Sequence, residues 1–220
     1  RNCGLKLARA PFVFILDADN WIYPNCLDTL YQAINTSGCA AVYGIINRFN
    51  TDTGKGAGLI SFYEWDVREL LNGPYIDAMA MFKKDILLQI GGYSTELMLI
   101  AWSGWEDYDI WLNLAQSGYN AKLIPQILSA YRVHPNSMIN TTNSYTNILA
   151  QHFRKKFSKL IEQHEDLDVF FGVTHPLTVE TDAEVVAQLQ EAQAKIAWME
   201  TSKFWKLRGR VLQIKKWGKS

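Results

Sequence analysis

The sequence predicts an α/β fold, because three consecutive segments have the patterns of a strand, a helix and a second strand. Residues 11–16 form a continuous apolar run, which is typical of a strand buried on both faces in a parallel sheet. Residues 25–36 repeat apolar side chains at helical spacing and end at a Ser-Gly stop signal, and residues 40–46 are again strand-like. A strand, a helix and a strand in this order form the repeating unit of α/β proteins.

The elements expected further along the chain continue this alternation. They are a helix over 59–71, a strand near 76–82, a helix over 84–90, a turn at Gly91-Gly92, a helix over 105–117, and a strand over 121–131 that Pro125 interrupts. Residues 51–58 are rich in glycine but lack the spacing of a phosphate-binding loop, so we expect a plain connection there.

Composition and charge exclude several classes of protein. The 220 residues are 48% hydrophobic and 20% charged, which is the composition of a globular chain of about 1.5 domains. The formal net charge is zero, which argues against a nucleic-acid-binding protein. Three cysteines without paired spacing favour a reducing, cytoplasmic setting, and no apolar run has the length of a membrane span.

The C-terminal segment differs from the rest. Residues 201–220 carry seven basic side chains and no acidic one, and apolar residues recur every three or four positions over 185–214. We expect an amphipathic basic helix over 181–220 that contacts the cytoplasmic face of an anionic membrane. Docking on the preceding α/β domain, or a dimer paired through residues 185–199, would explain the same pattern.

Two aspartates, Asp17 and Asp19, follow the first predicted strand. Alternation along the strand places both carboxylates on the same side, and ligands of α/β sheets bind at the carboxyl ends of strands. Carboxylates so close together favour a bound Mg²⁺ or Mn²⁺ that also contacts substrate phosphates. A turn followed by a helix N-cap is an equally good interpretation of Asp-Ala-Asp-Asn.

A second acidic motif, Glu106-Asp107, opens the helix predicted over 105–117. Asp107 lies three and four positions before the apolar Ile110 and Trp111, so it shares their inward face. A half-buried carboxylate in a cleft is the usual general base. Acids in a first helical turn also complement the helix dipole, which explains their presence but not the inward position.

Three further residues are weaker candidates. His134 follows a strand and enters a polar loop, where a neutral imidazole could complete an oxygen-rich metal site, although an isolated histidine more often has no such role. Trp102 and Trp105 could form a flat wall for a sugar ring, although aromatic residues near the start of a helix more often belong to the core.

The order of these motifs resembles that of family 2 glycosyltransferases, which have the GT-A fold. The matching segments cover about residues 1–138. They are Arg1-Asn2, Leu16-Asp-Ala-Asp19, Gly91-Gly92-Tyr93, Trp105-Glu-Asp107 and Tyr131-Arg-Val-His134, and the ending Ser202–Arg208 resembles a C-terminal helix of bacterial members.

The resemblance implies inverting transfer from a nucleotide-diphosphate sugar to a saccharide or lipid-linked acceptor, in polysaccharide or glycoconjugate synthesis. It implies that Asp17 and Asp19 face the ribose and the metal-bound diphosphate, that Asp107 deprotonates the acceptor hydroxyl, and that His134 is a third metal ligand. Asn20 departs from the pattern, since relatives commonly have an acid there. The units that hold the nucleotide base would precede Arg1, so the isolated chain is expected to be a poor enzyme.

The resemblance also gives the expected domain organisation: the C-terminal part of a GT-A domain in residues 1–150, a helical or irregular connection in 151–180, and the basic helix in 181–220. One alternative is a noncatalytic α/β domain whose tail binds a membrane or a partner helix. A metal-assisted phosphohydrolase would also use acids at strand ends, but it gives no role to the inward Asp107.

Overall fold

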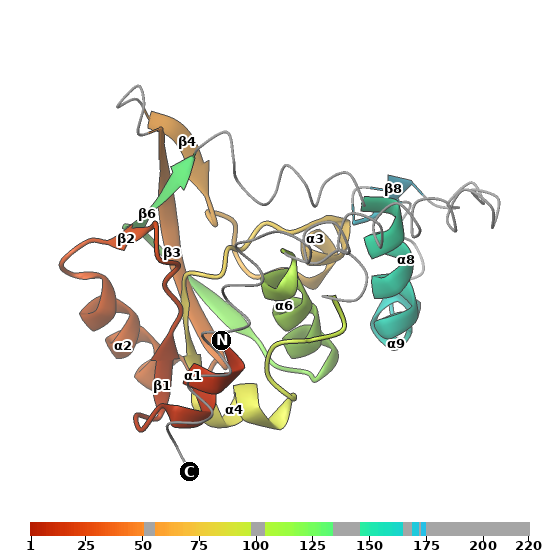
Figure 1. Cartoon of the computed structure of the whole chain (residues 1–220), viewed down its shortest axis with the longest axis horizontal. Helices are drawn as coiled ribbons and strands as arrows, with labels where there is room; N and C mark the ends of the chain where they lie inside the picture. The colour runs from red at the N-terminus through yellow and green to blue at the C-terminus, as the bar shows by residue number, and fades with distance from the viewer. Residues whose placement is uncertain (51–55, 98–103, 134–145, 165–168, 172, 175–220) are drawn as a thin grey trace, which may run out of the picture.

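A mixed sheet with helices on both faces confirms the predicted α/β class (Figure 1). The computed structural model describes residues 1–50, 56–97, 104–133, 146–164, 169–171 and 173–174. Within these residues the main sheet has the order β1-β5-β3-β6-β2, and β4 pairs with β3 outside this path. β3 and β6 pair in parallel and the other neighbours are antiparallel. The strands are β1 (Phe12–Phe14), β2 (Trp21–Ile22), β3 (Ala41–Asn50), β4 (Gly56–Ile60), β5 (Ala80–Lys83) and β6 (Ala121–Val133).

The described helices and a small second sheet complete the fold. The helices are α1 (Asn2–Leu7), α2 (Cys26–Ser37), α3 (Val67–Asn72), α4 (Lys84–Gln89), α6 (Glu106–Gln116), α8 (Thr146–Lys156) and α9 (Ser158–Glu162). The second sheet pairs β7 (Val169–Phe170) with β8 (Val173–Thr174).

The two faces of the main sheet carry different layers of helices. Side chains alternate along β3, so that Val42 packs in a cluster with α2, while Ala41 and Tyr43 pack in the larger cluster with α3, α6 and α8. In Figure 1, α2 lies to the left of the sheet and α6 and α8 lie to its right. The large cluster also contains Leu5 of α1 and Leu87 of α4, so both short helices belong to the second layer.

Pro125 bends β6 without ending it. The pairing with β3 jumps from Gly44 opposite Ile124 to Ile45 opposite Ile127, which leaves the proline in a bulge. A glycine is needed at position 44 because Leu128, just after the bulge, lies close to its backbone: a Cβ there would come within 2.7 Å of a Leu128 methyl. The strand therefore continues to Val133 and carries the chain toward the turn that follows β1.

Several expectations need correction. β1 has only three residues, is half-buried and pairs antiparallel with β5, so it is not the doubly buried parallel strand predicted over 11–16. Most of the helix predicted over 59–71 is replaced by the end of β4, an irregular stretch and α3, because Ser61 adopts a left-handed backbone. The helices predicted over 25–36 and 84–90 are confirmed, as is the glycine turn, with both φ angles positive.

The predicted helix over 181–220 and the pairing segment 185–199 lie outside the described residues. Within the described part of the chain, no helix is long and apolar enough to cross a membrane. Cys3, Cys26 and Cys39 are all free thiols.

Candidate active site

The acidic residues after β1 lie in a turn rather than on the strand. β1 ends at Phe14, and the Asn20 amide donates to the Asp17 carbonyl over 3.1 Å, so strand alternation does not orient Asp17 and Asp19. Asn20 joins this turn to the end of β6, because its Oδ1 accepts from the Arg132 amide over 2.9 Å. Two donors there, Asn20 Nδ2 and Arg132 Nε, are buried and lack an acceptor among the described residues.

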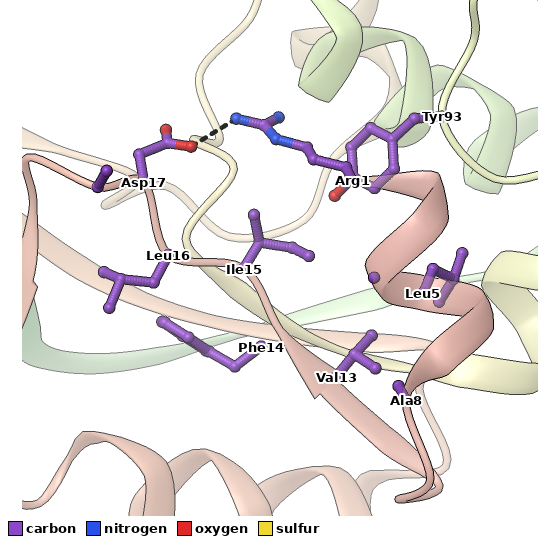
Figure 2. Close-up of a pocket in the computed structure, with 11 residues that line it drawn as sticks. Arg1, Leu5, Ala8, Val13, Phe14, Ile15, Leu16, Asp17 and Tyr93 are labelled. Carbon is purple, nitrogen blue, oxygen red and sulfur yellow. Dashed lines mark hydrogen bonds and ion pairs between the residues drawn. The ribbon is translucent and has the colours of Figure 1, made fainter. Parts of the chain in front are cut away.

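Arg1 links this turn to the start of α6. One guanidinium nitrogen lies 2.7 Å from Asp17 Oδ1, and the other lies 3.1 Å from Glu106 Oε1. The guanidinium also lies 5.3 Å from the centre of the Tyr93 ring, a cation–π distance. Figure 2 shows Arg1 reaching from the first turn of α1 toward Asp17, with Tyr93 beside it. The two acidic motifs, 89 positions apart, are therefore joined by one cation.

Asn2 fixes the segment that carries Tyr93. Its side-chain amide donates to the Tyr93 carbonyl and accepts from the Tyr93 amide, both over 2.8 Å. Gly92 is required beside it, since φ is +71° and a Cβ would lie 2.8 Å from Asn2 Oδ1. Arg1 therefore bridges Asp17 and Glu106, and Asn2 holds the backbone of Tyr93 so that its ring lies beside the Arg1 guanidinium.

A pocket of about 510 Å³ opens beside this bridge. Its walls are α1 and the segment from β1 to the acidic turn, and Figure 2 shows Val13, Ile15 and Leu5 lining its apolar part. Arg1, Asp17 and Tyr93 form its polar end. A largely apolar cavity with a few convergent polar groups is the usual form of a small-molecule site.

Asp107 lies in the first turn of α6, as predicted, and is half-buried. Burial, followed by the charges of Asp77 and Glu106, raises the pKa of Asp107 to about 7. Its Oδ1 accepts a hydrogen bond from the Tyr108 amide over 2.9 Å. This bond lowers the pKa of Asp107, but by less than burial raises it. A carboxylate with a pKa close to neutral can accept and release a proton under cellular conditions.

Asp77 is a site residue that the sequence analysis missed. It precedes β5, its amide donates to Ser61 Oγ, and its Oδ1 accepts from the Met79 amide, both over 2.9 Å. Burial and then the nearby charge of Asp17 raise the pKa of Asp77 to about 6, against the effect of the Met79 hydrogen bond. The signal was available: Asp77 is the only charged residue in the otherwise apolar stretch over 75–82.

Asp109 is the second residue that the sequence did not single out. It is 1% exposed and pairs with Lys156 of α8 over 2.7 Å. Lys156 also lies 3.8 Å from Glu96, and His152 lies 3.9 Å from the same carboxylate. Burial and then the charge of Lys156 lower the pKa of His152, which keeps this imidazole neutral near pH 7.

Of the three weaker candidates, one packs against the core and the other two lie outside the residues that the structure describes. Trp105 lies against Phe171 and Tyr108, with ring centres 5.2 and 6.4 Å apart, so much of its indole contacts the core. Trp102 and His134 lie outside the described residues. Among the described residues, no group of three histidine, cysteine or acidic side chains could by itself hold a metal ion.

Comparison with known proteins relates the first part of the chain to one family. Residues 1–94, which include the acidic turn, Asp77 and Tyr93, match the family model "Glycosyl transferase family 2". No curated protein matches the sequence.

A solved structure of S. aureus TarS, residues 1–349, in complex with UDP-GlcNAc has a similar fold. The TM-score is 0.54 and the sequence identity 13%, and the match covers 87% of this chain. The likeness confirms the predicted GT-A fold class. The chain spans 58% of the length of that structure.

Proposed function

We propose that the protein transfers a sugar from a nucleotide-diphosphate sugar to a hydroxyl of a saccharide or lipid-linked acceptor, with inversion at the anomeric carbon. One observation carries the proposal: in a chain whose residues 1–94 match the family 2 glycosyltransferase model, Arg1 joins an acidic turn to a helix start that holds a carboxylate with a pKa of about 7. The UDP-GlcNAc bound to TarS supports a nucleotide sugar as the donor.

Asp17 and Asp19 would hold Mg²⁺ or Mn²⁺ on the donor side. The fit rests on chemistry at the turn: Asp17 already binds a cation, the Arg1 guanidinium, and two carboxylates suit an ion that keeps phosphate and water as its other ligands. The unmatched donors Asn20 Nδ2 and Arg132 Nε suit phosphate oxygens. When bound, the metal offsets charge on the leaving diphosphate. His134 remains a proposed third ligand.

Asp107 would act on the acceptor side. Its carboxylate accepts the proton of the acceptor hydroxyl while the oxygen attacks the anomeric carbon, and the bond from that carbon to the diphosphate breaks. A single displacement of this kind inverts the anomeric centre and needs only one base. Glu106, held by Arg1, would orient the acceptor or the helix start. Trp102 and Trp105 remain proposed acceptor contacts, and the free thiols suit a cytoplasmic enzyme.

Donor binding tests the proposal directly. Calorimetric titration of the full-length protein with UDP-GlcNAc and with a GDP-sugar, with and without Mn²⁺, should give metal-dependent binding for one of them. Asp19→Ala should weaken that binding more than about tenfold, whereas Asp28→Ala, on the exposed face of α2, should leave it unchanged. If neither nucleotide sugar binds, the result favours the alternative of a noncatalytic α/β domain. If Asp19→Ala binds normally with Mn²⁺, the metal role is wrong.

A further inference from the structure

The helix whose first turn carries the proposed base, α6, has no side-chain cap of its own. Trp105 precedes α6 in a left-handed conformation, with φ +64°, and provides no capping hydrogen bond. The first turn also concentrates three acids, Glu106, Asp107 and Asp109. Since uncapped helix ends fray, contacts from elsewhere must hold this turn in place.

Besides the Arg1–Glu106 ion pair, these contacts come from Phe153 and Lys156 of α8 and from Phe171, beyond both the main sheet and the family match. The buried Asp109 receives Lys156 of α8 at 2.7 Å on Oδ1, and its Oδ2 has no hydrogen-bond partner among the described residues. Lys156 is therefore the group that stabilises a carboxylate in an apolar environment. Burial raises the pKa of Asp109, and the Lys156 hydrogen bond and charge oppose that rise.

The neighbouring Tyr108 is held from the same side. Its ring stacks on Phe171 and meets Phe153 of α8 edge-on, with centres 5.2 and 5.3 Å apart. Its hydroxyl donates to the Leu70 carbonyl over 2.6 Å. Tyr108 and Asp109 directly follow Asp107, so α8 and the segment after it restrain the turn on which the base stands.

We infer that Lys156 is a positioning residue for Asp107 and acts through its ion pair with Asp109. The helix α8 then contributes to the geometry of the acceptor side of the site. The inference rests on the proposed role of Asp107 as the base. The four side chains that face one another here are Asp109 of α6, Lys156 and His152 of α8, and Glu96 from the segment before α6. Glu96 is largely exposed, so Asp109 is the partner that Lys156 holds in a fixed place.

Lys156→Met tests the inference, because it keeps the length of the side chain and removes the charge. Hydrogen exchange of the amides over 106–110 should accelerate at least about tenfold, while amides in β3 and β6 keep their rates. In the full-length protein kcat should fall about 10- to 100-fold with unchanged donor affinity, since a displaced base slows only the chemical step. Lys155→Met, on the exposed face of α8, is the matched control, and Lys156→Arg should restore most of the activity.

The double variant Asp109→Asn/Lys156→Met separates positioning from stability. Neutralising both partners of a buried pair removes the unpaired charge, so the free energy of unfolding should recover while kcat stays low. The inference is overturned if kcat recovers with stability. It is also overturned if Lys156→Met loosens all amides equally at unchanged kcat, or leaves residues 106–110 unaffected. Failure of the proposed function has a different signature, namely normal turnover in Asp107→Asn.

Discussion

The two sets of carboxylates in the site have the same chemistry in opposite surroundings. Asp17 has a side chain that is 36% exposed and paired with Arg1, and Asp19 in the same turn is exposed. Asp107 and Asp77 lie deeper, and burial is the main cause that raises the pKa of each, to about 7 and about 6. The comparison teaches that burial, rather than residue type, distinguishes the proposed roles: an accessible carboxylate suits a cation, and a desolvated one suits proton transfer.

Asp107→Asn should have the largest effect, because it removes the proposed proton acceptor and keeps its shape. We expect turnover to fall about 10²- to 10⁴-fold, with little change in donor affinity. Steady-state rates and calorimetric titration of the donor, measured on the same preparation, check both halves of this expectation.

Glu106→Gln is the matched control for that change. It removes a neighbouring carboxylate that pairs with Arg1, so the expected loss of turnover is smaller. Should the Gln variant lose turnover while Asp107→Asn stays near normal, the two roles must be exchanged and the contrast between buried and exposed acids would fail.

Asp77→Asn should shift the pH dependence of the reaction. The charge of Asp77 raises the pKa of Asp107, so its removal should lower that pKa from about 7. The base works when ionised, so the acid limb of the kcat profile should move to lower pH and the variant should retain more relative activity at pH 6. An unmoved limb, with the fold intact, would show that Asp77 does not interact with the base.

The same shifts set the pH dependence of stability. Asp77 and Asp107 have higher pKa values in the folded chain than the usual 3.8, so the folded state binds more protons between pH 4 and 7. Stability should therefore fall as the pH rises through this window and level off above it. Replacing either acid by asparagine should flatten the slope of the urea midpoint against pH.

The sequence predicted the parts of the fold that local pattern controls. The α2 helix ends at Gly38 in the left-handed conformation, and the turn at Gly91-Gly92 follows α4. The sequence-based prediction was wrong where tertiary contacts determine the backbone conformation. Ser61 is held in a left-handed conformation while its Oγ accepts from the Asp77 amide, and that constraint replaces much of the helix expected over 59–71.

In the candidate site, local sequence patterns pointed to Asp17, Asp19 and Asp107. They did not point to Asp77 and Asp109, whose surroundings come from residues far along the chain. The spacing of Asp107 to Ile110 and Trp111 predicted its inward position, and its role as the base stays a prediction. Asp109 was not singled out, because its partner Lys156, 47 positions later, gives no local signal. Asp77 could have been noticed as a charge in an apolar stretch, but its proximity to Asp17 and Asp107 depends on the order of strands in the sheet.

The smallest expected effect concerns the support of Arg1 on the donor side. Asn2→Ala removes both hydrogen bonds to the Tyr93 backbone, which should lower the free energy of unfolding by about 1–2 kcal/mol in urea titration. Because Tyr93 then no longer confines the guanidinium, donor affinity should weaken by a few-fold, about 1 kcal/mol or less. The kcat profile that we attribute to Asp107 should keep its shape, since Asp77 and Asp107 lie on other elements. Asn35→Ala, an exposed position of α2 with one hydrogen bond within its own helix, provides the control. If Asn2→Ala moved the acid limb as far as Asp77→Asn does, the two sets of carboxylates would be one coupled unit rather than two environments.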